Sequence, residues 1–171
     1  NKTRIAGLFL SHGHEDHIGA VSKLLKTIDI PVYGSGFTLE LLKDALTEND
    51  IDITKHVFFK VDSKSRMKFN EIIVEFYNVT HSIPESLGIS IKTPDGNIVY
   101  APDYNFDQTV SKEYKTDFAK LASLGGSKVL ALLTESLGAD RVGITHSSDR
   151  LDYALNQAFY EAKSRIIVSA F

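Results

Sequence analysis

The stretch from Ser11 to Gly19, with the letters SHGHEDHIG, constrains this chain more than any other part of it. Four of its residues are common metal ligands: His12, His14, Asp16 and His17. Imidazole and carboxylate groups together suit zinc, manganese or iron ions. The whole chain has only six histidines, so three of them within six positions are hard to attribute to chance. We therefore expect a metal site, and the alternative is a solvated polar loop whose histidines bind nothing.

The sequence on either side of this stretch places it on a loop. Residues 4–10 are continuously apolar after Arg4, which predicts a strand buried on both faces. Apolar residues then recur at helical spacing, which predicts an amphipathic helix over residues 16–27. The candidate ligands thus lie where a strand gives way to a helix, and side chains on such a loop can converge on one point.

Composition bounds the remaining possibilities. With 171 residues, of which 43% are hydrophobic and 24% charged, the chain is long enough for one globular domain with an apolar core. Its net charge of -3 argues against broad electrostatic binding of nucleic acid, but it is compatible with a local basic groove. There is no cysteine, so any metal must be held by nitrogen and oxygen. No apolar run approaches the ~20 residues of a membrane-spanning helix, so we expect no membrane partner.

The rest of the chain alternates between strand and helix patterns. We predict strands over residues 31–33, 56–61, 71–79, 87–92, 97–101, 129–133 and 166–171, and helices over residues 37–46, 115–124 and 151–162. Alternation in the third of these strands predicts that it is half-buried, with Glu75 and Tyr77 pointing away from the core. The strands at 129–133 and 166–171 are apolar enough to be buried. This mixture favours a layered α/β domain whose ligands bind at strand ends.

Later side chains at strand ends can join the first cluster. Three of them come directly after predicted strands: His81, Asp103 and Glu135. A strand-end position alone is weak evidence, but together with the first cluster it makes each of them a candidate site residue. The two remaining histidines, His56 and His146, are expected to be structural or exposed to solvent.

The candidate ligands can be divided between two ions. A catalytic ion needs three protein ligands and an open position. The first ion would be held by His12, His14 and His81. Asp16 and His17 would take a second ion, and Asp103 could bridge both because a carboxylate has two oxygens. Two ions about 3.5–4 Å apart can activate a nucleophile and clamp a phosphoryl group. The second ion needs one more ligand, for which this sequence offers no good candidate.

Five segments resemble motifs of one known family. Residues 11–19 are similar to its second motif nearly letter for letter, and residues 81–86 (HSIPES) resemble its third, which usually has Asp at position 85. Residues 103–109 (DYNFDQT) resemble its fourth motif, 132–136 (LLTES) the acidic first motif of an inserted domain, and 164–171 (SRIIVSAF) a strand of that insertion. The chain therefore resembles the metallo-β-lactamase fold, more closely its β-CASP nuclease branch, and within that branch the ribonuclease J family.

The resemblance implies both an architecture and an activity. A partial metallo-β-lactamase-type αββα core would cover residues 1–135, and residues 136–171 would begin a β-CASP α/β insertion. The activity would be zinc-dependent hydrolysis of RNA phosphodiester bonds, as a 5′-to-3′ exonuclease, an endonuclease or both, in cytoplasmic RNA decay and processing, including rRNA processing. RNA would be the substrate, and the intact protein would be a homo-oligomer (dimer or tetramer) or a heteromer with a paralogue.

The same resemblance gives roles to individual residues. Two Zn²⁺ ions per site, with Mn²⁺ as an alternative, would be bound by His12, His14, Asp16, His17, His81 and Asp103. Catalytic roles would fall to Asp16, His81, Asp103 and Glu135. The chain begins at Asn1 rather than Met and ends in an apolar run, so we expect a fragment. The resemblance implies that a closing segment outside it supplies a further histidine for the second ion and residues that grip the RNA phosphate.

The chain departs from the family at a few positions. Pro102 and Asn105 stand where members commonly have Gly and Lys, and Leu137 lies in the stretch TESLG, where members usually have SDSTN. Two alternatives stay open, the first because the ligand cluster alone does not distinguish substrates and the second because of these departures. One is another hydrolase of the same fold, acting on a thioester, a lactone or a small phosphodiester. The other is a non-catalytic paralogue that serves as a subunit of an RNA-degrading complex.

Overall fold

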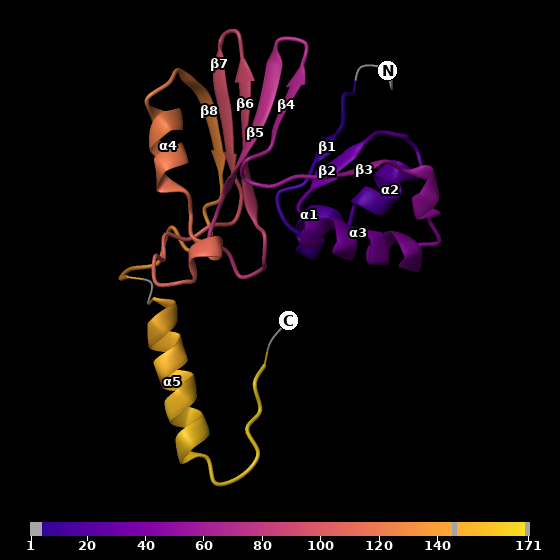
Figure 1. The fold of residues 1–171 in the computed structure, drawn as a ribbon. Helices are drawn as coiled ribbons and strands as arrows, with labels where there is room; N and C mark the ends of the chain where they lie inside the picture. Colours follow the sequence, from indigo (N-terminus) through magenta and orange to yellow (C-terminus); the bar gives the residue numbers. More distant parts are fainter. Residues whose placement is uncertain (1–4, 145–146, 170–171) are drawn as a thin grey trace.

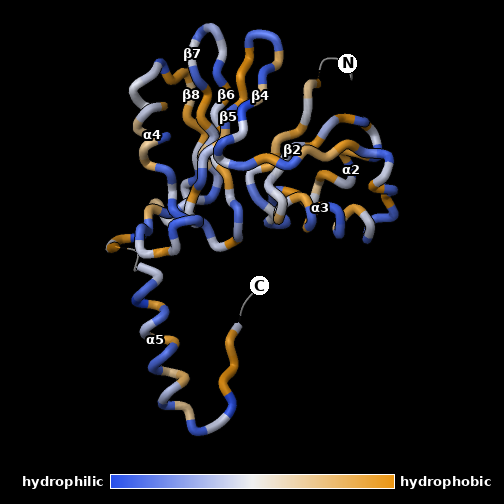
Figure 2. Tube along the Cα trace, viewed as in Figure 1, coloured by the Kyte–Doolittle hydropathy of each residue, from blue (hydrophilic) through white to orange (hydrophobic). Residues whose placement is uncertain are grey.

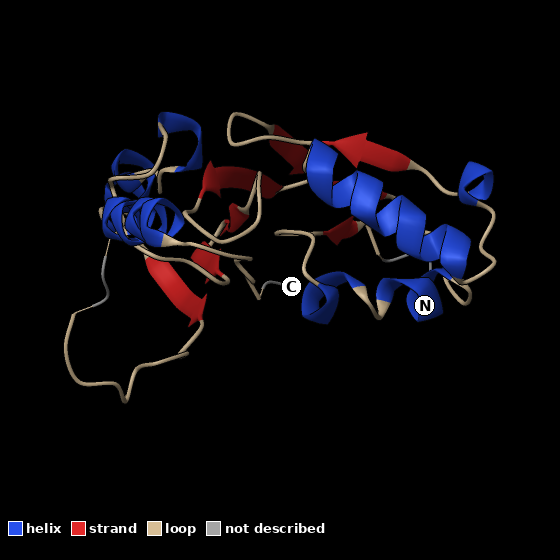
Figure 3. Cartoon of the chain, turned by 90° about the horizontal axis from the view of Figure 1, so that it is seen from below, coloured by secondary structure: helices blue, strands red, loops and turns tan. Residues whose placement is uncertain are grey.

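The computed structural model describes residues 5–144 and 147–169, which form two sheets flanked by helices (Figure 1). The first half of the chain builds a parallel sheet in the order β1-β2-β3, together with three helices. Its elements are β1 (Leu8–Phe9), α1 (Glu15–Ile18), α2 (Val21–Leu25), β2 (Val32–Gly34), α3 (Gly36–Glu48), the 3₁₀ helix η2 (Ile53–Lys55) and β3 (Phe58–Lys60). Seen from below, the long helix α3 lies over this sheet (Figure 3).

The second half builds a five-stranded sheet in the order β4-β5-β6-β7-β8. Neighbouring strands are antiparallel, except that β8 returns parallel to β7 after α4. The elements are β4 (Arg66–Phe69), β5 (Ile72–Asn78), β6 (Leu87–Thr93), β7 (Gly96–Ala101), the 3₁₀ helix η3 (Lys112–Tyr114), α4 (Phe118–Gly125), β8 (Val129–Thr134) and α5 (Ser148–Glu161). The predicted strands that became β5, β6 and β7 are confirmed, whereas β4 was not predicted.

The molecule has four layers, and an apolar cluster lies between each pair of neighbouring layers. The first cluster joins the helices α1 to α3 to the first sheet and contains Val32 and Leu42, both fully buried. The second lies between the two sheets and includes Tyr33 and Phe76. The third joins the second sheet to α4 and contains Tyr77. Successive strand residues face opposite layers, as the pleat of a strand requires. The order helix, sheet, sheet, helix confirms the predicted αββα architecture.

The predicted exposure of Glu75 and Tyr77 is wrong, because α4 covers that face of the sheet. Tyr77 is fully buried and its hydroxyl donates a 3.0 Å hydrogen bond to the carbonyl oxygen of Tyr100. Its ring lies against Gly88 on β6, where a Cβ atom would come within 2.1 Å of the ring. Both faces of β5 are therefore buried, because one face packs in the cluster between the two sheets and the other in the cluster under α4.

Two other predictions about the elements are corrected. The helix expected over residues 16–27 is two short helices, α1 and α2. The first ends at Ile18 and has Gly19, a poor helix former, as its C-cap, where a Cβ would lie 2.7 Å from the backbone oxygen of Glu15. The N-terminal strand is also shorter than expected, since within the described residues 5–10 β1 covers Leu8–Phe9 alone, and Arg4 lies outside the described residues.

The C-terminal part is less buried than expected. Strand β8 pairs only with β7 among the described residues, and Leu132 on it is 62% exposed. Residues 166–169 were predicted as a buried strand, but they are exposed and form no strand, because no other strand of the described chain lies beside them. Helix α5 extends away from the two sheets, and the chain after it has hydrophilic residues at 163–165 and becomes apolar from residue 166 (Figure 2). None of the helices in the described ranges is long and apolar enough to cross a membrane.

Candidate metal centre

The loops at one end of both sheets carry the predicted ligands. His12 follows β1, His14 precedes the first residue of α1, and Asp16 and His17 lie within that helix. From the second sheet, His81 follows β5 and Asp103 follows β7. The backbone N–H of Leu87 donates a 2.9 Å hydrogen bond to the carbonyl of Ser11, which joins the two halves beside this cluster.

The structure brings the first predicted group together. Its possible ligand atoms all lie within 4.8 Å of one another, on His12, His14, His81 and Asp103. Nδ1 of His14 and Nε2 of His81 are 3.0 Å apart. Oδ2 of Asp103 lies 3.3 Å from Nε2 of His12 and 3.4 Å from Nε2 of His81. Three imidazoles and a carboxylate from three separate loops are a donor set that suits a transition-metal ion.

The second group shares Asp103 with the first. Nε2 of His17 lies 3.3 Å from Oδ2 of Asp103 and 3.4 Å from Oδ2 of Asp16. These three residues again have possible ligand atoms within 4.8 Å of one another. The Asp16 side chain is 77% exposed, so this group is more open to solvent than the first. One carboxylate oxygen therefore touches histidines of both groups, which is the geometry of a bridging ligand.

His12 provides a test of whether these residues fit a metal ion. Its side chain is fully buried, and burial, followed by the nearby charges of His17 and His81, lowers its pKa to about 4. The ring is therefore neutral at pH 7, so its contact with Asp103 is not an ion pair. Nε2 has no hydrogen-bond partner among the described residues. Nε2 of this buried, neutral imidazole lies among the possible ligand atoms of the first group. This fits metal ligation, because a buried polar atom without a partner would otherwise cost folding free energy.

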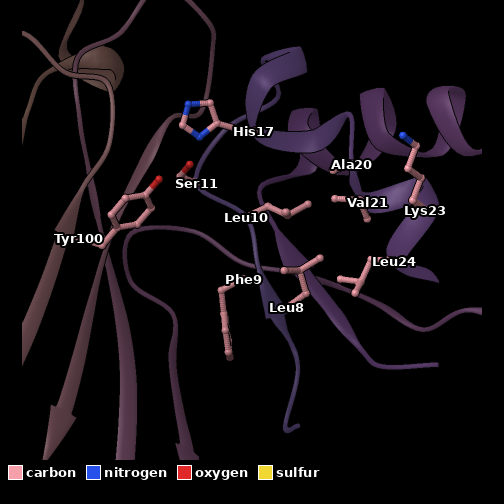
Figure 4. A pocket seen from close by; sticks show the side chains of 10 residues that line it. All are labelled: Leu8, Phe9, Leu10, Ser11, His17, Ala20, Val21, Lys23, Leu24 and Tyr100. Atoms are coloured by element: carbon pink, nitrogen blue, oxygen red, sulfur yellow. The ribbon is translucent and has the colours of Figure 1, made fainter. Parts of the chain in front are cut away.

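The other ring nitrogen of His12 is also held in place. Nδ1 lies 3.1 Å from Oγ of Ser11, and the Ser11 hydroxyl lies near the hydroxyl of Tyr100. Figure 4 shows the two hydroxyls close together below the ring of His17, at one end of a cavity of about 580 Å³. Such partners fix the tautomer and orientation of a ligating histidine. Ser11 and Tyr100 were not singled out from the sequence, because nothing in the local pattern marks a residue that supports a ligand.

Glu135 lies beside the two groups rather than in either of them. Its Oε1 accepts a 2.7 Å hydrogen bond from the backbone N–H of Tyr104, the residue after Asp103. Glu135 and Asp103 also line a cavity of about 440 Å³ together with His17. The structure thus places this carboxylate next to the ligand loop, where it can face a substrate.

The two histidines expected to lie outside the site have separate outcomes. His56 is half-buried at the end of η2, and its Nδ1 is 3.7 Å from Oδ1 of Asp29, outside both ligand groups. His146 lies outside the described residues. This position agrees with the expectation that His56 is structural or exposed to solvent.

The sequence profile of the β-lactamase superfamily domain matches residues 1–129. The chain belongs to the β-lactamase superfamily. As a member of this superfamily it is similar to ribonuclease J 2 of Staphylococcus epidermidis, with 41% identity over all 171 residues, and to ribonuclease J 2 of Staphylococcus aureus, with 38% identity over the same length. The chain spans 30% of the length of these curated relatives.

Solved structures show the same fold at low sequence identity. A protein of unknown function from Enterococcus faecalis superposes with a TM-score of 0.62 and 19% identity, covering 92% of this chain and 39% of that one. Zn²⁺-bound PqqB from Methylobacterium extorquens superposes with a TM-score of 0.55 and 14% identity, covering 77% of this chain and 46% of that one. The fold of this superfamily member is therefore of the metallo-β-lactamase type.

Proposed function

We propose that this chain carries the metal centre of a ribonuclease that hydrolyses RNA phosphodiester bonds in RNA processing and decay. One observation carries the proposal: Oδ2 of Asp103 lies 3.3 Å from both His12 and His17, which belong to different ligand groups. A site for two ions that share a carboxylate suits phosphoryl transfer. Similarity to ribonuclease J 2 proteins over the whole of this chain supports RNA as the substrate rather than a thioester, a lactone or a small phosphodiester.

Each ligand then has a proposed role. The first ion would be held by His12, His14 and His81, and the second by Asp16 and His17, with Asp103 contacting both. Zinc is the proposed metal and manganese the alternative, since the donors are nitrogen and oxygen only. The bound ions would supply Lewis-acid stabilisation of the charge that develops on the phosphoryl oxygens. Ser11 would hold His12 in the tautomer whose Nε2 faces the site.

Glu135 is the proposed catalytic residue that lies outside the ligand set, in addition to the ligands Asp16, His81 and Asp103. Its Oε1 is occupied by the N–H of Tyr104, so Oε2 is the oxygen that would accept a hydrogen bond or a proton from a group in the cavity. The same hydrogen bond would hold the Asp103 loop against the end of β8. We further propose that residues 1–135 form the metallo-β-lactamase core and that residues 136–171 begin a β-CASP domain, because α5 packs on neither sheet (Figure 1).

The wider biological setting is also a proposal. We infer that the protein acts on RNA in the cytoplasm, as a homo-oligomer or together with a paralogue, in exonucleolytic or endonucleolytic cleavage. One observation favours a second candidate, a non-catalytic subunit of an RNA-degrading complex. The second ligand group has three donors among the described residues, one of them the largely exposed Asp16, so it would hold an ion less firmly than the first.

An RNA cleavage assay separates these candidates. End-labelled single-stranded RNA should be cleaved by the wild-type protein in the presence of Zn²⁺ or Mn²⁺ and left intact by the Asp103→Ala variant. The matched control is Asp95→Ala, which removes an exposed carboxylate from the β6–β7 turn at the other end of the sheet. Undiminished cleavage by Asp103→Ala would overturn the proposed site. Metal-loaded wild-type protein that binds RNA without cutting it would instead support the non-catalytic subunit.

A further inference from the structure

Two buried threonines, Thr80 and Thr116, lie next to the loop that carries the candidate ligand His81. The backbone N–H of Thr80 donates to Oγ1 of Thr116 at 2.9 Å, and the backbone N–H of Thr116 donates to Oγ1 of Thr80 at 2.9 Å. Their exposed fractions are 3% and 4%. The hydroxyl of each threonine thus accepts a hydrogen bond from the backbone N–H of the other, although the two residues are 36 positions apart.

The hydroxyl of Thr116 also reaches a third segment. It donates a 3.0 Å hydrogen bond to the carbonyl of Asn105, whose own N–H donates to the carbonyl of Thr80 at 2.8 Å. Thr80 directly precedes His81, and Asn105 lies two positions after Asp103. A single hydroxyl therefore contacts the two loops that bring the second sheet's ligands into the site.

The start of α4 anchors this hydroxyl to the sheet. The backbone N–H of Asp117 donates to the carbonyl of Asn78 at the end of β5, and the Asp117 side chain accepts from Lys120 N–H at 2.9 Å as the N-cap of α4. Thr116 is thereby fixed on both sides, by β5 and by α4. Because its polar contacts are buried, losing the hydroxyl would leave the Thr80 N–H and the Asn105 carbonyl without their partner.

We propose that Thr116 is a positioning residue for the metal centre, whose hydroxyl sets the separation between His81 and Asp103. The proposal rests on the metal binding proposed above. Ligands must be held within about 0.5 Å of the productive geometry for a site to bind its ion well. His81 and Asp103 come from different loops, so their relative position depends on the contacts between those loops, and Thr116 makes contacts to both.

Cobalt binding by the purified full chain tests this role, because the visible spectrum of Co²⁺ reports its ligand geometry. Thr116→Val keeps the shape of the side chain and removes the hydroxyl, and it should weaken Co²⁺ binding by about 10–100-fold and change the spectrum. Thr116→Ser keeps the hydroxyl and should restore both. The matched control is Thr93→Val, which removes a hydroxyl bonded at 2.8 Å to the Gly96 carbonyl at the opposite end of the sheet.

The outcomes are distinguishable. Wild-type affinity and spectrum in Thr116→Val would overturn the positioning role, and so would an equal loss in Thr93→Val, since that would mean a general effect of stability. A wild-type chain that binds no Co²⁺ would overturn the proposed metal centre first. If Thr116→Val does not fold, Thr116→Ala takes its place, and affinity equal to that of Thr116→Ser would overturn the role.

Discussion

Nδ1 of His14 lies 3.0 Å from Nε2 of His81, although 67 positions separate the two histidines in the chain. His14 belongs to the loop after the first sheet's edge strand, and His81 belongs to a loop of the second sheet. Their approach is produced by the packing of the two sheets through the cluster that contains Tyr33 and Phe76. The site is thus a product of tertiary structure, while its richest motif is local in sequence.

Asp103→Ala should reduce metal content more than His81→Ala does. Asp103 contacts histidines of both groups, whereas His81 belongs to the first group alone. Elemental analysis after dialysis is expected to show about two ions per wild-type chain, a partial loss in His81→Ala and a larger loss in Asp103→Ala. Asp95→Ala serves as the control and should keep the wild-type content. Full metal content in Asp103→Ala would contradict the bridging role.

Ser11→Ala should weaken metal binding without exposing the site. The change removes the 3.1 Å contact to Nδ1 of His12, so the ring loses the partner that fixes its orientation. Loss of such a partner typically costs about 10–100-fold in affinity. Competition with a chelator of known affinity measures the change, and Ser123→Ala, on an exposed position of α4, provides the comparison. Equal affinities in the two variants would show that Ser11 does not orient His12.

Gly88→Ala should destabilise the fold. A Cβ at this position would come within 2.1 Å of the Tyr77 ring, which is fully buried and hydrogen-bonded to Tyr100, so the ring has no room to yield. We expect a loss of about 1–3 kcal/mol in the free energy of unfolding, measured by urea denaturation. Gly125→Ala in α4 meets no atom within 4 Å and should instead stabilise by about 0.5–1 kcal/mol. A harmless Gly88→Ala would contradict the packing described for β5 and β6.

Glu75 should make stability depend on acid pH. Burial opposes its ionisation, but hydrogen bonds from Lys120 (2.8 Å) and Lys92 (2.9 Å) outweigh that effect and hold its pKa below the ordinary 4.5. The carboxylate therefore contributes stability above pH 4.5, and this contribution is lost as the pH falls through the lowered pKa. Glu75→Gln should be less stable than wild type by about 1–3 kcal/mol at pH 7. Thermal unfolding should show that gap closing in acid, and a gap independent of pH would refute the prediction.

Much of the site could be predicted because its information is local. Spacing within Ser11–Gly19 indicates ligands directly, and the rule that ligands gather at strand ends placed His81 and Asp103 near them. Their roles as ligands stay a prediction, but the structure gathers them into two groups that share Asp103. Thr116 had no such signal, since it fell at the start of the helix predicted over residues 115–124 and nothing distinguishes it there until the fold brings it against Thr80.

The errors in the predicted fold also arise from contacts between residues far apart in the sequence or from missed local signals. Glu75 and Tyr77 have the alternation of a half-exposed strand, but α4, which lies far away in sequence, covers their face. Strand β4 was missed although Met67 and Phe69 alternate with charged residues, and Asn70, with a φ of 54°, makes the turn into β5. The strand over residues 166–171 was predicted from its apolar composition and from a family resemblance, and a strand also needs a neighbour to pair with, which residues 166–169 lack among the described residues.

The division of the ligands between two sheets also affects the thermodynamics of folding. His12 and His14 belong to one half of the molecule and His81 to the other, so an ion bound between them would tie the halves together like a reversible cross-link. By mass action, such an ion stabilises the folded state in proportion to the logarithm of its free concentration. The supply of metal would then govern how stable the folded molecule is as well as whether its site is filled.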